Sequence, residues 1–255
     1  MTLRALLFDV DGTLAETEEV HRRAFNEAFR AFDLDWSWDR ALYGELLKVT
    51  GGRERMRHFA QLSQLPIAED PDFPDLVRRI HQWKTRRYGE LLADGEVSLN
   101  PGVERLLREA RDADLLLAIA TTTTPENVEA LLIPALGAGA MDWFAAIGAG
   151  DMVPQKKPAP DIYHWVMDEL EVSADTCLAF EDSANGVRSA LAAALPVLVT
   201  PGIYTRDDSF DGASAVISHL GEPDRPFEVL AGKVPEGRCV NLGWLRELHG
   251  TARTR

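Results

Sequence analysis

The stretch FDVDGTLAETE, residues 8–18, places two aspartates at the end of a hydrophobic run. The run ALLFDV, residues 5–10, has the length and composition of a buried β-strand. Asp9 lies within this run, and Asp11 follows directly after it. A buried charge is unfavourable unless it is paired or bound to a metal. We therefore expect the strand to end at a site where other groups compensate the two carboxylates.

Hydrophobic runs of similar length recur along the chain and alternate with helical patterns. We expect further strands at 115–121, 143–149, 176–182, 196–200 and 214–218. We expect helices at 102–112, 125–136, 159–171 and 184–194. Strands that alternate with helices of this length favour right-handed crossovers and a mostly parallel sheet. The pattern predicts an α/β fold with a Rossmann-like parallel sheet as its core.

The interval between the first strand and the next strand–helix unit spans roughly 80 residues and shows only helical periodicity. Apolar residues repeat at every fourth position, at Val20, Ala24, Ala28 and Phe32. Further helical patterns cover 39–48, 53–63 and 74–93. An uninterrupted helical segment inside an alternating pattern indicates an insertion into the α/β core.

This insertion divides the chain into parts. We interpret residues 16–96 as a helical cap domain, inserted into a core domain made of residues 1–15 and 97–222. Residues 223–255, which are rich in Pro, Gly and Arg, form a C-terminal extension to which we assign neither an element nor a role.

Composition and charge narrow the class of partner. The 255 residues include 27 Lys plus Arg against 41 Asp plus Glu, a formal net charge of −14, which disfavours nucleic acid and anionic membranes. Cys177 and Cys239 are too few for a disulfide framework and do not have a metal-binding spacing. The longest weakly polar region, 130–150, is interrupted by Pro134 and Asp142, so we expect no membrane span. We expect a cytoplasmic monomer that acts on a small molecule.

Polar clusters stand at the ends of four predicted strands. In chain order they are Asp9 with Asp11, Thr121–Thr124, Lys156 with Lys157, and Glu181 with Asp182. Each cluster alone has an ordinary structural explanation, such as a tight turn, a solvated lysine pair or a helix start. Thr124 followed by Pro125, for instance, is typical of a helix N-cap. Ligands of open parallel sheets bind beyond the carboxyl ends of the strands, so four clusters there favour one common site.

Phosphoryl transfer is the chemistry that these clusters suit together. A carboxylate held at a strand end, such as Asp9, can act as a nucleophile towards phosphorus. Several carboxylates at one place require a divalent cation, and Mg²⁺ fits because it prefers oxygen ligands. The Lys157 ammonium and the Thr121 hydroxyl can then bind and orient the phosphoryl oxygens.

Four of these segments also resemble a known family. DVDGT, the threonine at the second strand end, KKPAPDIY and EDSANG match, in order and spacing, the four motifs of the haloacid dehalogenase superfamily of phosphohydrolases. The resemblance extends over nearly all of residues 3–220. Within that superfamily, TGGRERM, AIATTTTPENVEAL and TPGIYTR resemble the CbbY-type branch, whose members dephosphorylate xylulose 1,5-bisphosphate. β-Phosphoglucomutase is a near relative of that branch.

The resemblance implies a role for each matching core residue. Asp9 would be the nucleophile that forms an aspartyl-phosphate, and Asp11 the acid that protonates the leaving oxygen and then activates water. Mg²⁺ would be held by the Asp9 carboxylate, the Asp11 backbone carbonyl and Asp182, with Glu181 in support. The residues implied to bind the transferring phosphate are Thr121, Thr122 and Lys157.

The resemblance also implies a helical cap whose residues face the substrate. The cap positions that match substrate-contacting positions of the branch are Glu18, His21, Gly51, Gly52, Arg53 and Lys84. Gly51 and Gly52 would offer backbone N–H groups, and Arg53 and Lys84 would supply positive charge for a second phosphate.

Several activities remain open at this level. A Mg²⁺-dependent sugar-bisphosphate phosphatase is our leading interpretation, and a phosphomutase needs the same catalytic set. A dehalogenase would require neither Asp11 nor the metal-binding acids. A catalytically inactive sugar-phosphate-binding regulator is the alternative from a different functional class.

Overall fold

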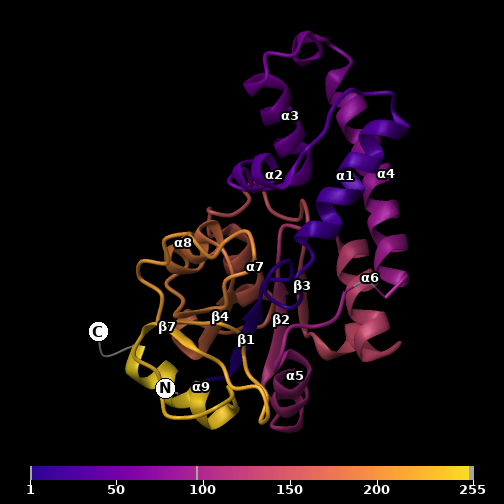
Figure 1. Ribbon diagram of the computed structural model, residues 1–255. Helices are drawn as coiled ribbons and strands as arrows, with labels where there is room; N and C mark the ends of the chain where they lie inside the picture. Colours follow the sequence, from indigo (N-terminus) through magenta and orange to yellow (C-terminus); the bar gives the residue numbers. More distant parts are fainter. Residues whose placement is uncertain (1, 96, 253–255) are drawn as a thin grey trace.

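The computed structural model describes residues 2–95 and 97–252 of the chain (Figure 1). Its sheet has the strand order β3-β2-β1-β4-β5-β6-β7. The strands are β1 (Ala5–Phe8), β2 (Leu116–Ala120), β3 (Ala146–Gly148), β4 (Cys177–Glu181), β5 (Val197–Val199), β6 (Ala215–Ile217) and β7 (Val229–Gly232). All neighbouring strands pair in parallel except β6 and β7, which are antiparallel. The predicted α/β fold with a mostly parallel sheet is confirmed.

The register of the central strands brings the predicted clusters to one edge. Phe8 at the end of β1 lies beside both Ile119 of β2 and Phe180 of β4. The residues that follow Phe8 and Phe180, which are Asp9 and Glu181, therefore lie at the same level of the sheet. Parallel pairing on both sides of β1 makes the carboxyl edge of the sheet the common site.

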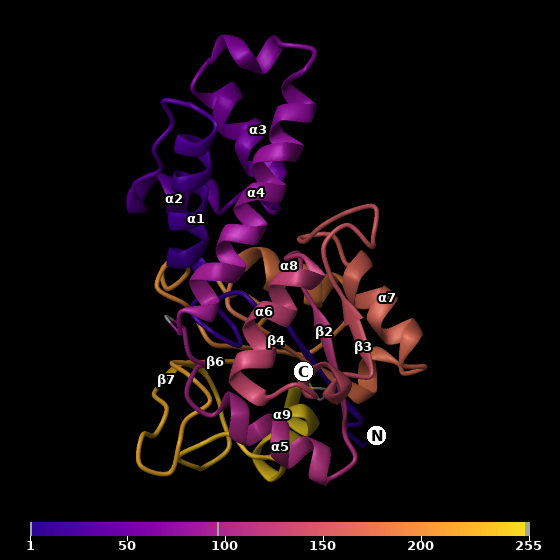
Figure 2. The same cartoon turned by 90° about the vertical axis from the view of Figure 1, so that its right-hand side faces the viewer.

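Helices cover both faces of the sheet. Successive residues of β1 point to opposite sides, and each set of apolar side chains is buried by its own pair of helices. The core helices are α5 (Val103–Asp112), α6 (Pro125–Leu136), α7 (Asp161–Glu169) and α8 (Ala184–Ala192). Apolar residues of α5 and α6 pack with Leu6 and Phe8, whereas those of α7 and α8 pack with Ala5 and Leu7. Figure 2 shows α6 and α7 on opposite sides of β2 and β3.

The inserted segment forms a separate group of helices beyond the carboxyl edge of the sheet (Figure 1). These are α1 (Glu18–Ala31), α2 (Arg40–Leu46), α3 (Gly52–Leu62) and α4 (Phe73–Ala93). They enclose an aromatic-rich core of their own that includes Phe25, Phe29, Trp38, Tyr43 and Phe59. The helices lie within the limits 16–96 that we predict for the cap. Residue 96 itself, and residues 253–255 of the extension, lie outside the described residues.

The two chain crossings between cap and core lie next to each other. Ala15, before the cap, forms an antiparallel bridge with Leu99, after it. The Asn100 backbone N–H donates to the Leu14 carbonyl at 2.8 Å, and its side-chain amide donates to the carbonyls of Gly12 and Thr13. The cap therefore begins and ends at a single place beside the Asp9–Asp11 segment.

Some elements differ in extent from the sequence predictions. The predicted strand 143–149 is reduced to Ala146–Gly148, because Ala140–Trp143 forms a 3₁₀ helix. The predicted helix 159–171 begins only at Asp161, where Pro160 occupies the N-cap position. Two further 3₁₀ helices cover Pro66–Glu69 and Ala174–Thr176.

The C-terminal extension contributes to the core domain. It contains β7, which extends the sheet, and α9 (Leu242–Ala252). Trp244, Leu245 and Leu248 of α9 are buried in the same apolar cluster as Leu106 of α5. Among the described helices, none combines the length and the apolar character that a membrane crossing requires.

Candidate active site

The Asp9 carboxylate is buried at the end of β1 and is paired with Lys157. Lys157 Nζ lies 2.7 Å from Asp9 Oδ1 and 2.6 Å from Glu181 Oε1. Burial raises the pKa of Asp9 to about 7, although Lys157 opposes the shift. Burial acts to lower the pKa of Lys157, but Asp9 and Glu181 outweigh it and raise this pKa. Lys157 therefore stays charged and supplies the compensation that the buried aspartate requires.

Three buried carboxylates form a group that can hold a cation. Asp9, Glu181 and Asp182 each bring one oxygen to within 4.8 Å of the others. Burial, followed by the charges of Asp9 and Glu181, raises the pKa of Asp182 well above its ordinary value. Glu181 Oε2 is buried without a hydrogen-bond partner among the described residues. An all-oxygen donor set with uncompensated negative charge fits Mg²⁺. The Asp11 side chain is not part of this group of three.

The turn after β1 depends on a glycine. Gly12 has φ +83°, a left-handed conformation that side chains disfavour, and a Cβ there would overlap the Asp182 carboxylate. The glycine of the DVDGT motif thus allows the backbone to lie directly against the Asp182 carboxylate. Gly186 allows the same close approach at the start of α8, where a Cβ would overlap the Glu181 carboxylate.

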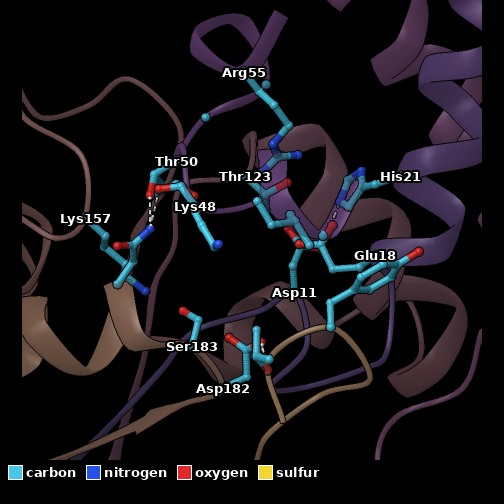
Figure 3. Close-up of a pocket in the computed structure, with 18 of the residues that line it drawn as sticks. Asp11, Glu18, His21, Lys48, Thr50, Arg55, Thr123, Lys157, Asp182 and Ser183 are labelled. Carbon is cyan, nitrogen blue, oxygen red and sulfur yellow. Dashed lines mark hydrogen bonds and ion pairs between the residues drawn. The ribbon is translucent and has the colours of Figure 1, made fainter. Parts of the chain in front are cut away.

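Asp11 is held in a different set of contacts, provided by the first cap helix. The Thr17 hydroxyl lies 2.5 Å and His21 Nε2 lies 3.0 Å from Asp11 Oδ1. His21 Nδ1 in turn contacts the Lys84 ammonium, and its ring stacks on Tyr88 at 3.9 Å between centroids. Burial would raise the pKa of Asp11, but the His21 charge and the hydrogen bonds from His21 and Thr17 outweigh it and lower this pKa. Figure 3 shows His21 close to Asp11.

A cavity of about 650 Å³ joins the core residues to the cap. Asp9, Asp11, Lys157, Glu181 and Asp182 line it from the core. The predicted phosphate-binding residues Thr121 and Thr122 also line it. Thr124 occupies the N-cap position of α6, but its hydroxyl makes no capping bond and is buried without a partner among the described residues.

Comparison with known proteins assigns the family. A family model for haloacid dehalogenase-like hydrolases matches residues 3–194. The chain belongs to the haloacid dehalogenase-like hydrolases. This hydrolase is 48% identical over 249 residues, 97% of each chain, to Protein CbbY, plasmid, of Cupriavidus necator. The resemblance to this family and to its CbbY branch, inferred from motifs, is confirmed, and the matches show an enzyme of the phosphatase type.

Solved structures agree with the fold of this hydrolase. A crystal structure of a CbbY mutant from Rhodobacter sphaeroides in complex with xylulose-(1,5)bisphosphate has a TM-score of 0.80 and 46% identity. The match covers 88% of this chain and 98% of that one. β-Phosphoglucomutase from Clostridium difficile has a TM-score of 0.75 at 16% identity, with complete coverage of both chains, and supports the fold alone.

The cap of the hydrolase brings most of the predicted substrate-facing residues to the cavity. Those that line it are Glu18, His21, Gly51, Gly52 and Lys84. Burial lowers the pKa of Lys84 to about 7, and the ammonium also lies 4.8 Å from the centre of the Phe25 ring. Arg53 does not line the cavity, and it forms an ion pair with Asp151 in the loop after β3. The substrate contacts of all six residues remain predictions.

Arg55, which sequence reasoning missed, lines the cavity two residues after Arg53. It is buried and donates to the Leu46 carbonyl at 3.2 Å and to the Tyr43 hydroxyl at 3.1 Å. Tyr43 in turn donates to Glu18 at 2.7 Å. A signal was available, because Arg55 and Phe59 stand four residues apart on the apolar face of α3. An arginine within an apolar stripe indicates a buried cation with a partner.

Ion pairs and hydrogen bonds join the cap of the hydrolase to its core. Lys156 Nζ lies 3.1 Å from Glu54 of α3 and 3.0 Å from Asp151 of the core. The Asn185 amide, at the start of α8, donates to the Lys48 carbonyl and the Thr50 hydroxyl, both at 3.1 Å. Lys156 is therefore a cap–core bridge, whereas Lys157 pairs with the buried carboxylates of Asp9 and Glu181.

Proposed function

We propose that this hydrolase is a Mg²⁺-dependent sugar-bisphosphate phosphatase that removes one phosphate from xylulose 1,5-bisphosphate through an aspartyl-phosphate. The observation that carries the proposal is the shared cavity, in which the Asp9–Lys157 pair of the core faces cationic groups of the cap. The similarity to a CbbY protein crystallised with xylulose-(1,5)bisphosphate supports the choice of substrate.

In the first half-reaction Asp9 attacks phosphorus. A bond forms between an Asp9 carboxylate oxygen and the phosphorus atom while the bond from phosphorus to the sugar oxygen breaks. Asp11 donates a proton to the departing oxygen, which leaves as a sugar hydroxyl. Because its surroundings lower the pKa of Asp11, this step requires that a proton first be placed on the Asp11 carboxyl group.

In the second half-reaction the aspartyl-phosphate is hydrolysed. The ionised Asp11 accepts a proton from water, the water oxygen bonds to phosphorus, and the Asp9–phosphorus bond breaks to release phosphate. Hydrogen bonds from Thr17 and His21 stabilise the ionised form of Asp11 that this step requires.

The phosphoryl group is bound by residues that surround Asp9. Lys157 and Thr121 offer an ammonium and a hydroxyl at the adjacent strand ends, and Thr122 lines the same part of the cavity. Asp9, Glu181 and Asp182 would hold Mg²⁺, together with the Asp11 carbonyl. When bound, Mg²⁺ neutralises these carboxylates and polarises the phosphoryl oxygens.

A second phosphate requires donors at a distance from Asp9, and the cap supplies them. Gly51 and Gly52 form the N-terminus of the eleven-residue helix α3, where backbone N–H groups favour an anion. Arg55 adds positive charge to the cavity wall, and a bound anion would favour the charged form of Lys84, whose pKa is lowered to about 7 by burial. A chain with a net charge of −14 needs such local cations to attract a bisphosphate.

A phosphate-release assay on a panel of esters tests the proposal. We expect xylulose 1,5-bisphosphate to be hydrolysed faster than sugar monophosphates or an aryl phosphate, and EDTA to abolish the reaction. The control is Asp9→Asn, which should remain folded by circular dichroism and release no phosphate. Conversion of β-glucose 1-phosphate to glucose 6-phosphate without release of phosphate would instead identify a phosphomutase. Absence of Mg²⁺-dependent turnover on every ester would favour a sugar-phosphate-binding regulator.

A further inference from the structure

Thr205, in the loop after β5, contacts the metal-binding acid Asp182. Its Oγ1 lies 3.2 Å from Asp182 Oδ2, and both residues are buried. The Gly202 backbone N–H donates to the same Thr205 oxygen at 2.9 Å. Because that N–H can only donate, the Thr205 hydroxyl is left with its own proton to give to the carboxylate. The ionised Asp182 carboxylate can only accept, so in that state the hydrogen bond runs from Thr205 to Asp182.

This bond distinguishes the two oxygens of Asp182. Oδ2 accepts the Thr205 proton and also lies against Gly12, where an added Cβ would overlap it. With Oδ2 held on two sides, the Asp182 carboxylate has a fixed orientation beside Asp9 and Glu181. Residues that fix the orientation of a metal-binding carboxylate in this way strengthen metal binding without touching the metal.

The residues beside Thr205 are attached to the cap. The Tyr204 hydroxyl donates to Glu19 Oε2 of α1 at 2.5 Å, and the Ile203 backbone N–H donates to Glu16 Oε2 at 2.8 Å. The Tyr204 ring also meets the Tyr43 ring of α2 edge to face, at 5.5 Å between centroids. One short segment therefore contacts the cap through Tyr204 and the cation site through Thr205.

We propose that Thr205 is a positioning residue for Asp182 and that the segment Gly202–Thr205 couples docking of the cap to the orientation of this carboxylate. When the cap is docked, Tyr204 holds the segment in the place from which Thr205 reaches Asp182. Thermodynamic linkage makes the coupling reciprocal, so that the cation also favours the docked cap. The inference rests on the cation site of the proposed function.

Direct measurement of Mg²⁺ binding to the full chain by isothermal titration calorimetry tests the positioning role. Thr205→Val removes the hydroxyl at nearly constant volume, and we expect it to raise the Kd for Mg²⁺ about ten- to a hundredfold. Thr205→Ser retains the hydroxyl and should bind Mg²⁺ with the same Kd as wild type. The matched control is Thr176→Val, which removes another buried hydroxyl at the opposite end of β4 and should leave the Kd unchanged.

Tyr204→Phe tests the connection to the cap, because it removes only the hydroxyl that donates to Glu19. We expect the Kd for Mg²⁺ to rise severalfold although the substituted residue does not contact Asp182. Wild-type affinity in Thr205→Val would overturn the positioning role. Wild-type affinity in Tyr204→Phe, with weakened binding in Thr205→Val, would overturn the coupling to the cap. A wild-type chain that binds no Mg²⁺ would instead refute the proposed function.

Discussion

Asp9 and Asp11 stand two residues apart, yet their surroundings shift their pKa values in opposite directions. Burial, with the charges of Glu181 and Asp11, raises the pKa of Asp9 to about 7, against the effect of Lys157. His21 and Thr17 overcome burial at Asp11 and lower its pKa. Such divergence separates the roles of two chemically identical groups. Asp9 depends on cations for its charge, whereas Asp11 obtains its stabilisation from the cap.

At this scale the first prediction concerns Asp11→Asn. General acid–base catalysis typically contributes roughly 10²–10⁴-fold, so we expect kcat on a sugar bisphosphate to fall by about that factor. With an aryl phosphate, whose leaving group needs little protonation, formation of the aspartyl-phosphate should be affected less. Rapid-quench measurement of that step for both substrates provides the check. Equal losses for the two substrates would remove Asp11 from the role of acid.

A second prediction at the residue scale distinguishes two neighbouring arginines. Arg55→Met removes a cation that lines the cavity, whereas Arg53→Met removes one that is paired with Asp151. We expect Arg55→Met to lose about 1.5–3 kcal/mol of transition-state stabilisation, roughly ten- to a hundredfold in kcat/KM for xylulose 1,5-bisphosphate. The loss for an aryl phosphate should be smaller.

Arg53→Met is the matched control for this measurement and should change kcat/KM by a much smaller factor. Because Arg55 is buried, circular dichroism and a thermal melt must first show that both variants are folded. A larger loss in Arg53→Met than in Arg55→Met would support the substrate contact that the sequence resemblance implies for Arg53.

At the scale of elements, the packing of α4 against α3 includes a histidine that is difficult to protonate. A Cβ at Gly52 of α3 would approach His81 Nε2 of α4 within 2.8 Å. Burial, followed by the charges of Lys84, Arg53 and Lys156, lowers the pKa of His81 from 6.5 to about 3. The neutral imidazole is thus part of the contact between the two cap helices.

The pH dependence of stability follows from this shift. Between pH 6.5 and about 3 the unfolded chain protonates His81 and the folded chain does not, so stability is lost as the pH falls through this window. We expect His81→Gln to lose less stability than wild type between pH 7.5 and pH 5 in urea unfolding. His164→Gln, at an exposed position of α7, is the control. Identical slopes in wild type and His81→Gln would contradict the prediction.

Sequence patterns predicted helices and strands best where the hydrophobic pattern was accompanied by residues typical of the start or the interior of the element. The strand predicted at 5–10 was recognisable from its apolar run. The helix predicted at 125–136 was recognisable because Thr124 and Pro125 marked its start. The α9 helix was missed. Its residues Trp244, Leu245 and Leu248 are identified as one buried face only from their packing in the same apolar cluster as α5. Likewise, the acids and Lys157 could be placed by strand ends, and the position of Arg55 in the apolar stripe of α3 was a signal that could have been used. Thr205, in contrast, reaches Asp182 through the packing of a loop, which no local pattern encodes.

At the scale of the whole molecule, the C-terminal extension stabilises the core at the end away from the cap (Figure 1). Leu245 is fully buried, so Leu245→Ala should cost about 2–5 kcal/mol of unfolding free energy, measured in urea. The kcat of the folded protein should be unchanged, because α9 is remote from Asp9. Leu62→Ala, at a leucine that is 62% exposed, is the matched control. A loss of kcat without loss of stability would mean that the extension acts on the site.

The bridge between Ala15 and Leu99 has an evolutionary consequence. Because the inserted segment leaves and rejoins the core at adjacent positions, its length and content can change without displacing β1 or the residues at its end. Exchange of the insert beyond Thr17 and His21, which hold Asp11, can therefore alter which ester is admitted while the acids and Lys157 of the core stay in place. A short turn joining the two bridge residues would also leave a continuous core, so an ancestor without the insert is structurally possible. Diversification of substrates then requires no redesign of the catalytic strands.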